Sequence, residues 1–259
     1  MIFTIAGKEL KGLFASPLAW VVLCVVQIII GYAFLRRLDD FLQLQPQLAS
    51  MASMASAPGA TELVAAPVFG TLGALLLFVV PVLAMRLIAE ERRNQTMVLL
   101  MSAPVSMTEI VLGKFLGLVI FLLSIVALAM LMPLSIAGAT RLDYGLLAGL
   151  AAGAALLAAG FAAVSLYVSC LTVHPVAAAI GAFAALLGML LIGDAAGEGL
   201  RARGWGVAAS LAQVLSPIKN FEPFGKGIFD TYALTCSALL IAVFLMLAIR
   251  QLDAQRLRG

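Results

Sequence analysis

Residues 86–114 read RLIAEERRNQTMVLLMSAPVSMTEIVLGK, a strongly charged stretch between two long apolar runs. The stretch is too short to hold a folded domain of its own. In a chain that crosses a bilayer, such a stretch has to lie at a membrane surface, because charged side chains are costly in hydrocarbon. There a soluble partner can reach it, and we therefore expect it to be the main point of contact with other proteins.

The rest of the chain is too apolar for a soluble protein. Of its 259 residues, 63% are hydrophobic and 11% are charged, whereas soluble domains carry about 25% charged residues. A spanning helix needs about 20 apolar residues, and barrel strands would alternate in polarity, which these runs do not. Six runs approach or exceed that length and contain no Asp, Glu, Lys or Arg: 17–35, 66–85, 115–136, 145–173, 175–193 and 232–249.

The sequence therefore predicts an all-α polytopic membrane protein, with residues 1–259 forming a single transmembrane domain. Ser106 and Glu109 have the spacing of a capping box, in which each side chain caps the backbone of the other, and this places the start of the third span at 107. Pro104 would end whatever precedes it, so residues 91–103 are expected to be a separate short helix. The six predicted transmembrane helices are 17–35, 66–88, 107–136, 145–173, 175–193 and 232–250.

Residues 1–16 have the pattern of an amphipathic helix that lies in the membrane interface. One side carries apolar side chains, and the other carries Thr4, Lys8 and Lys11. The apolar side consists of Phe3, Ala6, Leu10, Leu13 and Phe14. Ser16-Pro17 then turns the chain into the first span, since proline suits a first helical turn.

Loop charges give the expected orientation. With the N-terminus inside the cell, the inner loops and termini hold nine Lys and Arg residues and the outer loops hold seven. Cytoplasmic loops carry the excess of such residues, so both termini are expected to be cytoplasmic. Residues 38–65 become an outer loop. Residues 209–230 are too apolar for a plain loop and too rich in proline and glycine for a span, and are expected to form re-entrant helices at the outer surface.

The sequence lacks the motifs of an energy-converting or catalytic site. Gly113-Lys114 and Gly225-Lys226 have neither the upstream glycine nor the following Ser or Thr of a phosphate loop. The three cysteines lack metal-ligand spacing and are expected to be free thiols, and His174 is expected to be structural or solvated. The net charge of +3 does not indicate nucleic acid binding. A membrane protein of this kind would have to take its energy from a partner.

Three segments carry a family resemblance. The pattern R-L-I-A-E-E-R-R-x-x-T-M-x-L-L-x-S-A-P-V-S-x-x-E-I-V-L-G-K-F, which begins at Arg86, resembles the second-span exit and cytoplasmic loop of ABC-2 type permeases. KELKGLFASPLAWVVL at 8–23 resembles their elbow helix and first span. NFEPFGKGIFDTYAL at 220–234 resembles the entry to the sixth span in the gliding-motility branch, to which the nitrous-oxide-reductase maturation permeases are near relatives.

The resemblance implies a non-enzymatic membrane subunit of an ATP-binding-cassette exporter in the bacterial inner membrane. Two permeases, identical or homologous, would each rest on one ATPase subunit, which holds the ATP and magnesium; this chain would hold no cofactor or metal. Membrane lipid and an accessory protein are the other expected partners. Residues 91–103 would be the coupling helix that docks on the ATPase, and residues Lys8, Glu9 and Lys11 would belong to the elbow helix.

The coupling residues implied by the resemblance fall into two groups. Charged side chains would pair across the interface, and apolar ones would fill a groove of the ATPase. The set is Glu90, Glu91, Arg92, Arg93, Thr96, Met97, Leu99, Leu100 and Met101. The chain departs from the family where Gly-Thr usually stands, at Gln95-Thr96, and where an acidic residue usually stands, at Val98.

Two other functions are compatible with the sequence. An integral-membrane lipid-modifying enzyme would need clustered polar residues near one membrane face, and the outer segment offers Glu198, Arg203, Lys219 and Glu222. A non-transporting anchor of a multiprotein machine would look like a permease in sequence. The ABC-2 reading also covers mechanical or assembly work in place of export, and the sequence does not name the cargo.

Overall fold

The computed structural model describes the backbone of residues 1–51, 59–95, 106–140, 142–202, 204–205, 214 and 216–256, and the side chains of these residues except 47–51 and 194–202. Within these residues the regular structure is helical. Six helices are long and apolar enough to cross a membrane. The predicted all-helical fold with six spans is therefore confirmed.

The helices run in the expected order. The short N-terminal helix is α1 (Ile2–Ala15), and the first span is α2 (Pro17–Met51). The second span consists of four contiguous pieces, η1 (Thr61–Ala65), α3 (Ala66–Ala84), η2 (Arg86–Glu90) and α4 (Glu91–Arg93), where η denotes a π-helix. The remaining spans are α6 (Met107–Ser135), α7 (Tyr144–Leu171), α8 (Pro175–Ala202) and α11 (Thr231–Arg256), and α10 (Pro217–Gly225) precedes the last of them.

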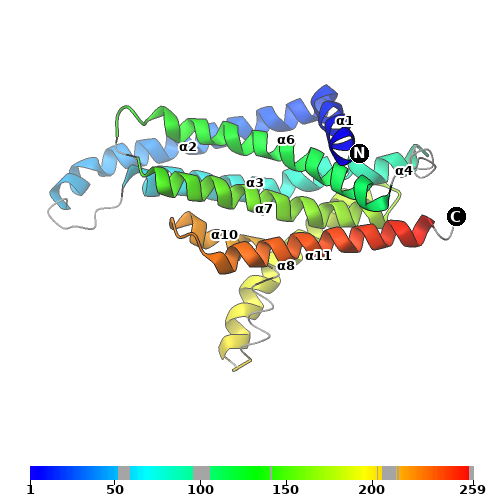
Figure 1. Ribbon diagram of the computed structural model, residues 1–259. Coiled ribbons are helices and arrows are strands. Elements are labelled where there is room, and N and C mark those ends of the chain that lie inside the picture. Colours follow the sequence, from blue (N-terminus) through cyan, green and yellow to red (C-terminus); the bar gives the residue numbers. More distant parts are fainter. Residues whose placement is uncertain are drawn as a thin grey trace.

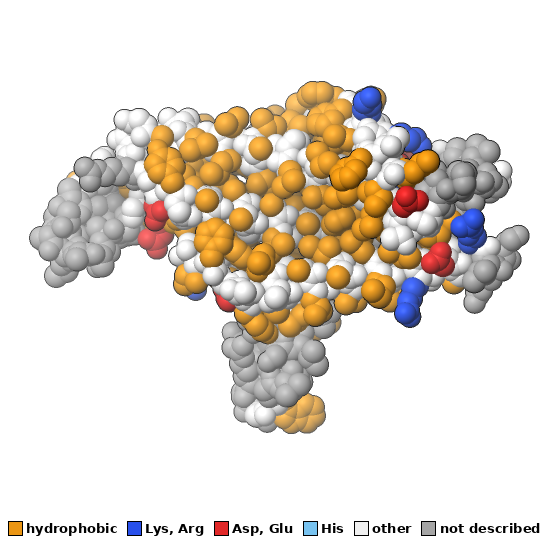
Figure 2. All heavy atoms as spheres, viewed as in Figure 1, with side chains coloured by type: hydrophobic (Ala, Val, Ile, Leu, Met, Phe, Trp, Pro, Cys, Tyr) orange, Lys and Arg blue, Asp and Glu red, His pale blue; other side chains and the backbone are white. Residues whose placement is uncertain are grey.

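Helix α7 is the centre of the bundle. It is the most buried span and packs against α3, α6, α8, α10 and α11 (Figure 1). Its small residues allow this close approach: a Cβ added at Gly153 would lie 2.7 Å from Cβ of Phe224. The Gly149–Gly153 pair thus packs within the chain, against α10. Hydrophobic side chains cover the middle of the face seen in Figure 2, and charged ones gather toward its ends.

The start of α1 and the end of α11 lie at the same end of the bundle as α4 (Figure 1). The charged stretch after the second span, α1 and the end of α11 therefore share one surface. This agrees with the expectation that both termini and the charged stretch lie on one side of the membrane. His174, in the tight corner between α7 and α8, is exposed.

The first span is longer than its apolar run. The sequence indicated a loop from residue 38, but α2 continues to Met51 and includes Pro46. Charged residues beyond the run do not end the helix, and two of them, Arg37 and Asp40, form an exposed i,i+3 ion pair of 3.8 Å along its surface. Hydropathy locates where a helix leaves hydrocarbon, whereas its backbone can continue in water.

The predicted boundary at residue 91 is also wrong. Residues Glu91–Arg93 continue the helix of the second span through η2, instead of starting a separate helix. The helix ends at Asn94, and Gln95 takes a φ of 58°, which is the left-handed region that favours glycine. This is the position where the resemblance described above would place glycine. The rest of the predicted coupling helix, 96–103, lies outside the described residues.

The outer segment contains one described short helix, α10. Its Phe224 is buried, and the helix packs mainly on α7 and α11. Residues 209–213 of the predicted re-entrant pair lie outside the described part of the chain. The third span begins as predicted: Ser106 accepts a hydrogen bond from the Glu109 backbone N–H at 3.2 Å, and the Glu109 carboxylate accepts one from the Ser106 N–H at 3.1 Å.

Candidate functional site

The exit segment, residues 86–95, is held in place by side chains from several other helices. At its start, Arg86 forms an ion pair with Glu90 at 3.2 Å and donates a hydrogen bond to the hydroxyl of Ser16, at the end of α1. The backbone N–H of Ala89 donates to Oγ of Ser169 on α7 at 3.1 Å. These two bonds tie the segment to α1 and α7. The segment begins with a π-helical turn, a rare form that occurs mostly as single turns inside α-helices.

A buried cation lies beneath this segment. Nζ of Lys114 is 2.8 Å from Oε1 of Glu91 and 2.9 Å from Oε1 of Glu9, and the Lys114 side chain is only 1% exposed. The three charges come from the exit segment, α1 and α6. They form a cluster that we call the Glu9–Lys114–Glu91 triad.

The four charged residues predicted to face the ATPase divide into two groups. Glu91 points to Lys114, and Arg92 donates a hydrogen bond to Oε1 of Gln255 near the end of α11. These two contacts hold the chain to itself. The Glu90 side chain is 39% exposed, and Arg93 is exposed together with the two residues that follow it, Asn94 and Gln95. Within the described part of the segment, the side chains open to a partner are therefore Glu90, which is paired with Arg86, and the continuous run from Arg93 to Gln95.

The remaining predicted site residues are placed as follows. Lys8 and Lys11 are exposed on α1, whereas Glu9 turns inward to the triad. Thr96, Met97, Leu99, Leu100 and Met101 lie outside the described residues. In the structure Glu9 and Glu91 contact the same lysine, Lys114. In the sequence they are separated by α2 and most of the second span.

Sequence reasoning missed Lys114 as a site residue. The signal was present, since Lys114 lies seven residues into an apolar helix, roughly 10 Å from its start at 1.5 Å per residue. A charge at that depth needs partners or an escape to water. The sequence offers several carboxylates near this membrane surface, and only the packing of α1 and the exit segment around Lys114 selects Glu9 and Glu91.

Two glycines beside Lys114 allow α1 to lie directly on α6. A Cβ added at Gly113 would be 2.7 Å from Cβ of Ile5, and one at Gly117 would be 2.8 Å from Cβ of Glu9. Met1 adds a peripheral contact, because its amino group lies 3.9 Å from Oε1 of Glu109. The elbow helix is thus packed tightly, and its buried residues Ala6 and Leu13 face the bundle.

Substituting Gly117 with valine is expected to displace α1 from α6. The new side chain would meet the backbone of α1 as well as Glu9, and overpacking of this kind typically costs 1–3 kcal/mol. Limited proteolysis of the purified protein would then cut the N-terminal helix faster than in the wild type. Gly138, where an added Cβ would meet nothing within 4 Å, provides the matched control; equal cleavage of Gly117→Val and Gly138→Val would contradict the packing.

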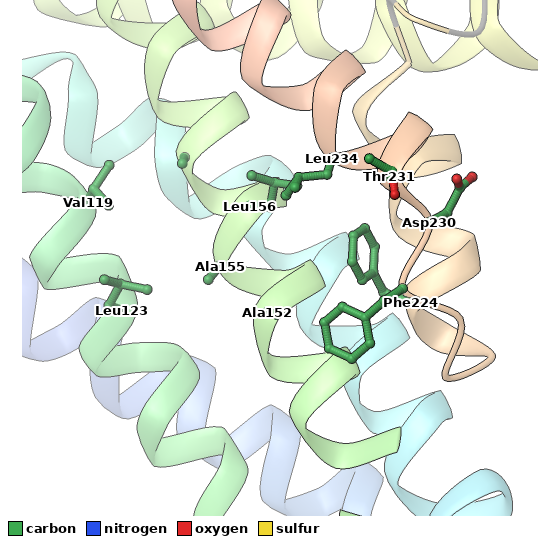
Figure 3. Close-up of a pocket in the computed structure, with 11 residues that line it drawn as sticks. Val119, Leu123, Ala152, Ala155, Leu156, Phe224, Asp230, Thr231 and Leu234 are labelled. Carbon is green, nitrogen blue, oxygen red and sulfur yellow. The ribbon is translucent and has the colours of Figure 1, made fainter. Parts of the chain in front are cut away.

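A separate pocket of about 560 Å³ lies between α6, α7 and the start of α11 (Figure 3). Val119 and Leu123 of α6 face the alanines of α7 across it, while Phe224, Asp230 and Thr231 lie at one end. Its lining holds no cation that would bind nucleotide phosphates. Among the residues searched, no cluster of His, Cys, Asp or Glu has the arrangement of a metal site.

The residues proposed for a lipid-modifying enzyme receive little support. Nζ of Lys219 lies 3.5 Å from Oε1 of Glu222, one turn along α10, so these two form a surface ion pair. Glu198 and Arg203 are outside the described side chains. Cys24, Cys170 and Cys236 are free thiols, as the sequence indicated.

Comparison with known proteins identifies the family. The sequence model of the family described as ABC-2 family transporter protein matches residues 3–250, nearly the whole chain. A search of curated proteins found no match. The matched region includes the elbow helix, all six spans and the exit segment. The chain therefore belongs to the ABC-2 transporter family, as a multi-pass membrane component of an ABC transporter.

Proposed function

We propose that this chain is the permease subunit that couples ATP hydrolysis by a separate ATPase to export across the bacterial inner membrane. The observation that carries the proposal is how the exit segment is held. Its helical part is anchored to α1, α6, α7 and α11, and its side chains from Arg93 to Gln95 are exposed. A segment anchored on four helices can pass a force applied beyond residue 93 to the whole bundle.

The docking surface would consist of Arg93 to Gln95 and the apolar residues Met97, Leu99, Leu100 and Met101. Charged residues at the rim steer association, and buried apolar side chains supply most of the affinity. The inward positions of Glu91 and Arg92 reassign these two residues from docking to anchoring. Reversing the charge of Glu91 would therefore damage the fold as well as the interface.

The assembly would contain two permeases and two ATPase subunits, with ATP and magnesium held by the ATPases. Both termini and the exit segment would be cytoplasmic. Outward-facing apolar side chains on α2 and α8, such as Ile28 and Ile180 at 70% and 64% exposure, would meet lipid or the second permease. The motif at 220–234 supports the gliding-motility branch, to which the nitrous-oxide-reductase maturation permeases are near relatives. Mechanical or assembly work in place of export is the other form that the coupled function would take. An accessory protein would be expected in either case.

A cysteine at Gln95 tests the docking. Gln95 is exposed and immediately precedes the proposed docking residues, so a photoreactive maleimide attached at Gln95→Cys should cross-link to the ABC ATPase encoded by a neighbouring gene. The background variant carries Cys24→Ala, since Cys24 is the exposed native cysteine. The measurement is an ATPase-containing adduct on a denaturing gel.

The matched control is Tyr144→Cys, at the start of α7, whose side chain is 64% exposed. It should give no ATPase adduct, and in intact cells it should react with an impermeant maleimide that leaves residue 95 unlabelled. An ATPase that co-purifies but cross-links only from residue 144 would refute the docking surface. Absence of any co-purifying ATPase would refute the coupled function.

A further inference from the structure

The Glu9–Lys114–Glu91 triad contains two ion pairs, whereas the burial of one lysine requires only one. Lys114 lies within the third span, and a lysine there can satisfy its charge with one carboxylate or by extending toward water. Here the side chain is 1% exposed and contacts two carboxylates, at 2.9 and 2.8 Å. The Glu9 and Glu91 side chains are themselves only 15% and 20% exposed.

The two carboxylates arrive from elements with different attachments. Glu9 lies in the middle of the elbow helix, whereas Glu91 lies in the middle of the exit segment, a few residues before the chain that would dock on the ATPase. Lys114 itself belongs to α6, which continues across the membrane. A single ammonium group therefore adds an ionic link between three elements, beside the Arg86–Ser16 hydrogen bond and the packing of α1 on α6.

Close to the triad, the elbow helix α1 is packed tightly on α6. The glycines at 113 and 117 bring the α6 backbone against α1, and an added Cβ at Gly117 would lie 3.0 Å from the carbonyl oxygen of Ala6. A displacement of Lys114 or α6 must therefore move α1 as well. On the other side, Glu91 belongs to the exit segment, whose side chains from Arg93 to Gln95 are exposed.

We propose that Lys114 is a positioning residue for coupling, which passes movement of the exit segment to the elbow helix through Glu91 on one side and Glu9 on the other. This inference rests on the proposed function. It assigns the two carboxylates different roles: Glu9 fixes the elbow helix to α6, and Glu91 connects that unit to the part of the chain moved by the ATPase.

The variants Glu9→Gln and Glu91→Gln separate these roles, because each removes one link and leaves the other. Spin labels at Thr4→Cys on α1 and Tyr144→Cys at the opposite end of the bundle report where the elbow helix lies; both positions are exposed. The background variant again carries Cys24→Ala. Asp40→Asn, which removes a surface ion pair with Arg37, is the matched control.

In the purified permease alone, Glu9→Gln is expected to broaden the distribution of distances between the labels. Glu91→Gln should leave it as narrow as in the wild type, since the Glu9 link remains. This measurement needs no ATPase. An equally narrow distribution in Glu9→Gln would overturn the fixing role of Glu9.

In the complex with the ATPase, trapping with ATP and vanadate is expected to shift the distance distribution in the wild type and in Asp40→Asn. Glu91→Gln should lose the shift while the complex still forms and hydrolyses ATP. A role confined to stability would leave the shift intact in every variant that folds. A normal shift in Glu91→Gln would therefore overturn the inference, whereas a wild-type permease that binds no ATPase would refute the proposed function.

Discussion

Replacing Lys114 with methionine is expected to lower the free energy of unfolding by about 3–5 kcal/mol, the usual effect of breaking a buried ion pair by removing one partner. The methionine fills nearly the same volume, so little is lost in packing. The cost arises because Glu9 and Glu91, both mostly buried, are left facing each other without their shared cation. The loss of stability would be measured by heating the detergent-solubilised wild type and variant and monitoring the remaining folded protein by size-exclusion chromatography.

A triple variant distinguishes charge from shape. Lys114→Met combined with Glu9→Gln and Glu91→Gln removes all three charges, so it should regain most of the stability that the single variant loses. Arg37→Met breaks an ion pair whose side chains are 52% and 54% exposed, and should change stability by no more than about 1 kcal/mol. A triple variant as unstable as Lys114→Met would show that the lysine acts through its packing.

The six long helices followed from sequence because membrane spanning imposes one strong rule. Hydrocarbon accepts only apolar side chains and a backbone with internal hydrogen bonds, so uncharged runs such as 145–173 had to be helices. The capping box at Ser106 and Glu109 added a local signal that does not depend on tertiary packing. The apolar runs and the capping box could both be recognised without knowing which helices pack against which.

The ends of helices outside hydrocarbon followed different physics and were less predictable. In water, a helix continues wherever side-chain pairs and packing support it, which is why α2 extends to Met51 and the second span reaches Arg93. Charge alone indicated a break in both places. The real break after Arg93 is marked by Gln95, a residue in the left-handed region, where the resemblance to ABC-2 permeases would place glycine.

The sequence located the candidate site, but it did not show which of the charged residues contact the rest of the chain and which are exposed to a partner. A run such as Glu90–Arg93 shows that a surface is charged, but each residue faces a different direction around a helix. Glu91 and Arg92 turn toward Lys114 and Gln255, while Arg93 remains exposed. Those partners lie on α6 and α11, far away in the chain, so only the packed bundle could reveal them.

Replacing Leu99 and Leu100 together with aspartate is expected to abolish stable binding of the ATPase. These leucines follow the last exposed residues of the exit segment and would enter an apolar groove. Apolar anchors of protein interfaces contribute about 2 kcal/mol or more each when truncated, which is roughly 30-fold in affinity. Aspartate adds the cost of burying a charge, so the double variant should lose at least about three orders of magnitude in affinity.

The same variant should leave the permease itself intact, because the anchoring contacts of Arg86, Glu91 and Arg92 remain. Its unfolding temperature should match the wild type while the ATPase no longer co-purifies. Leu42→Asp, a change at a 52% exposed leucine of α2 at the opposite end of the bundle, should keep the ATPase bound. If the double variant kept the ATPase at wild-type affinity, docking would have to rest on other residues, and force would enter the bundle somewhere other than the exit segment.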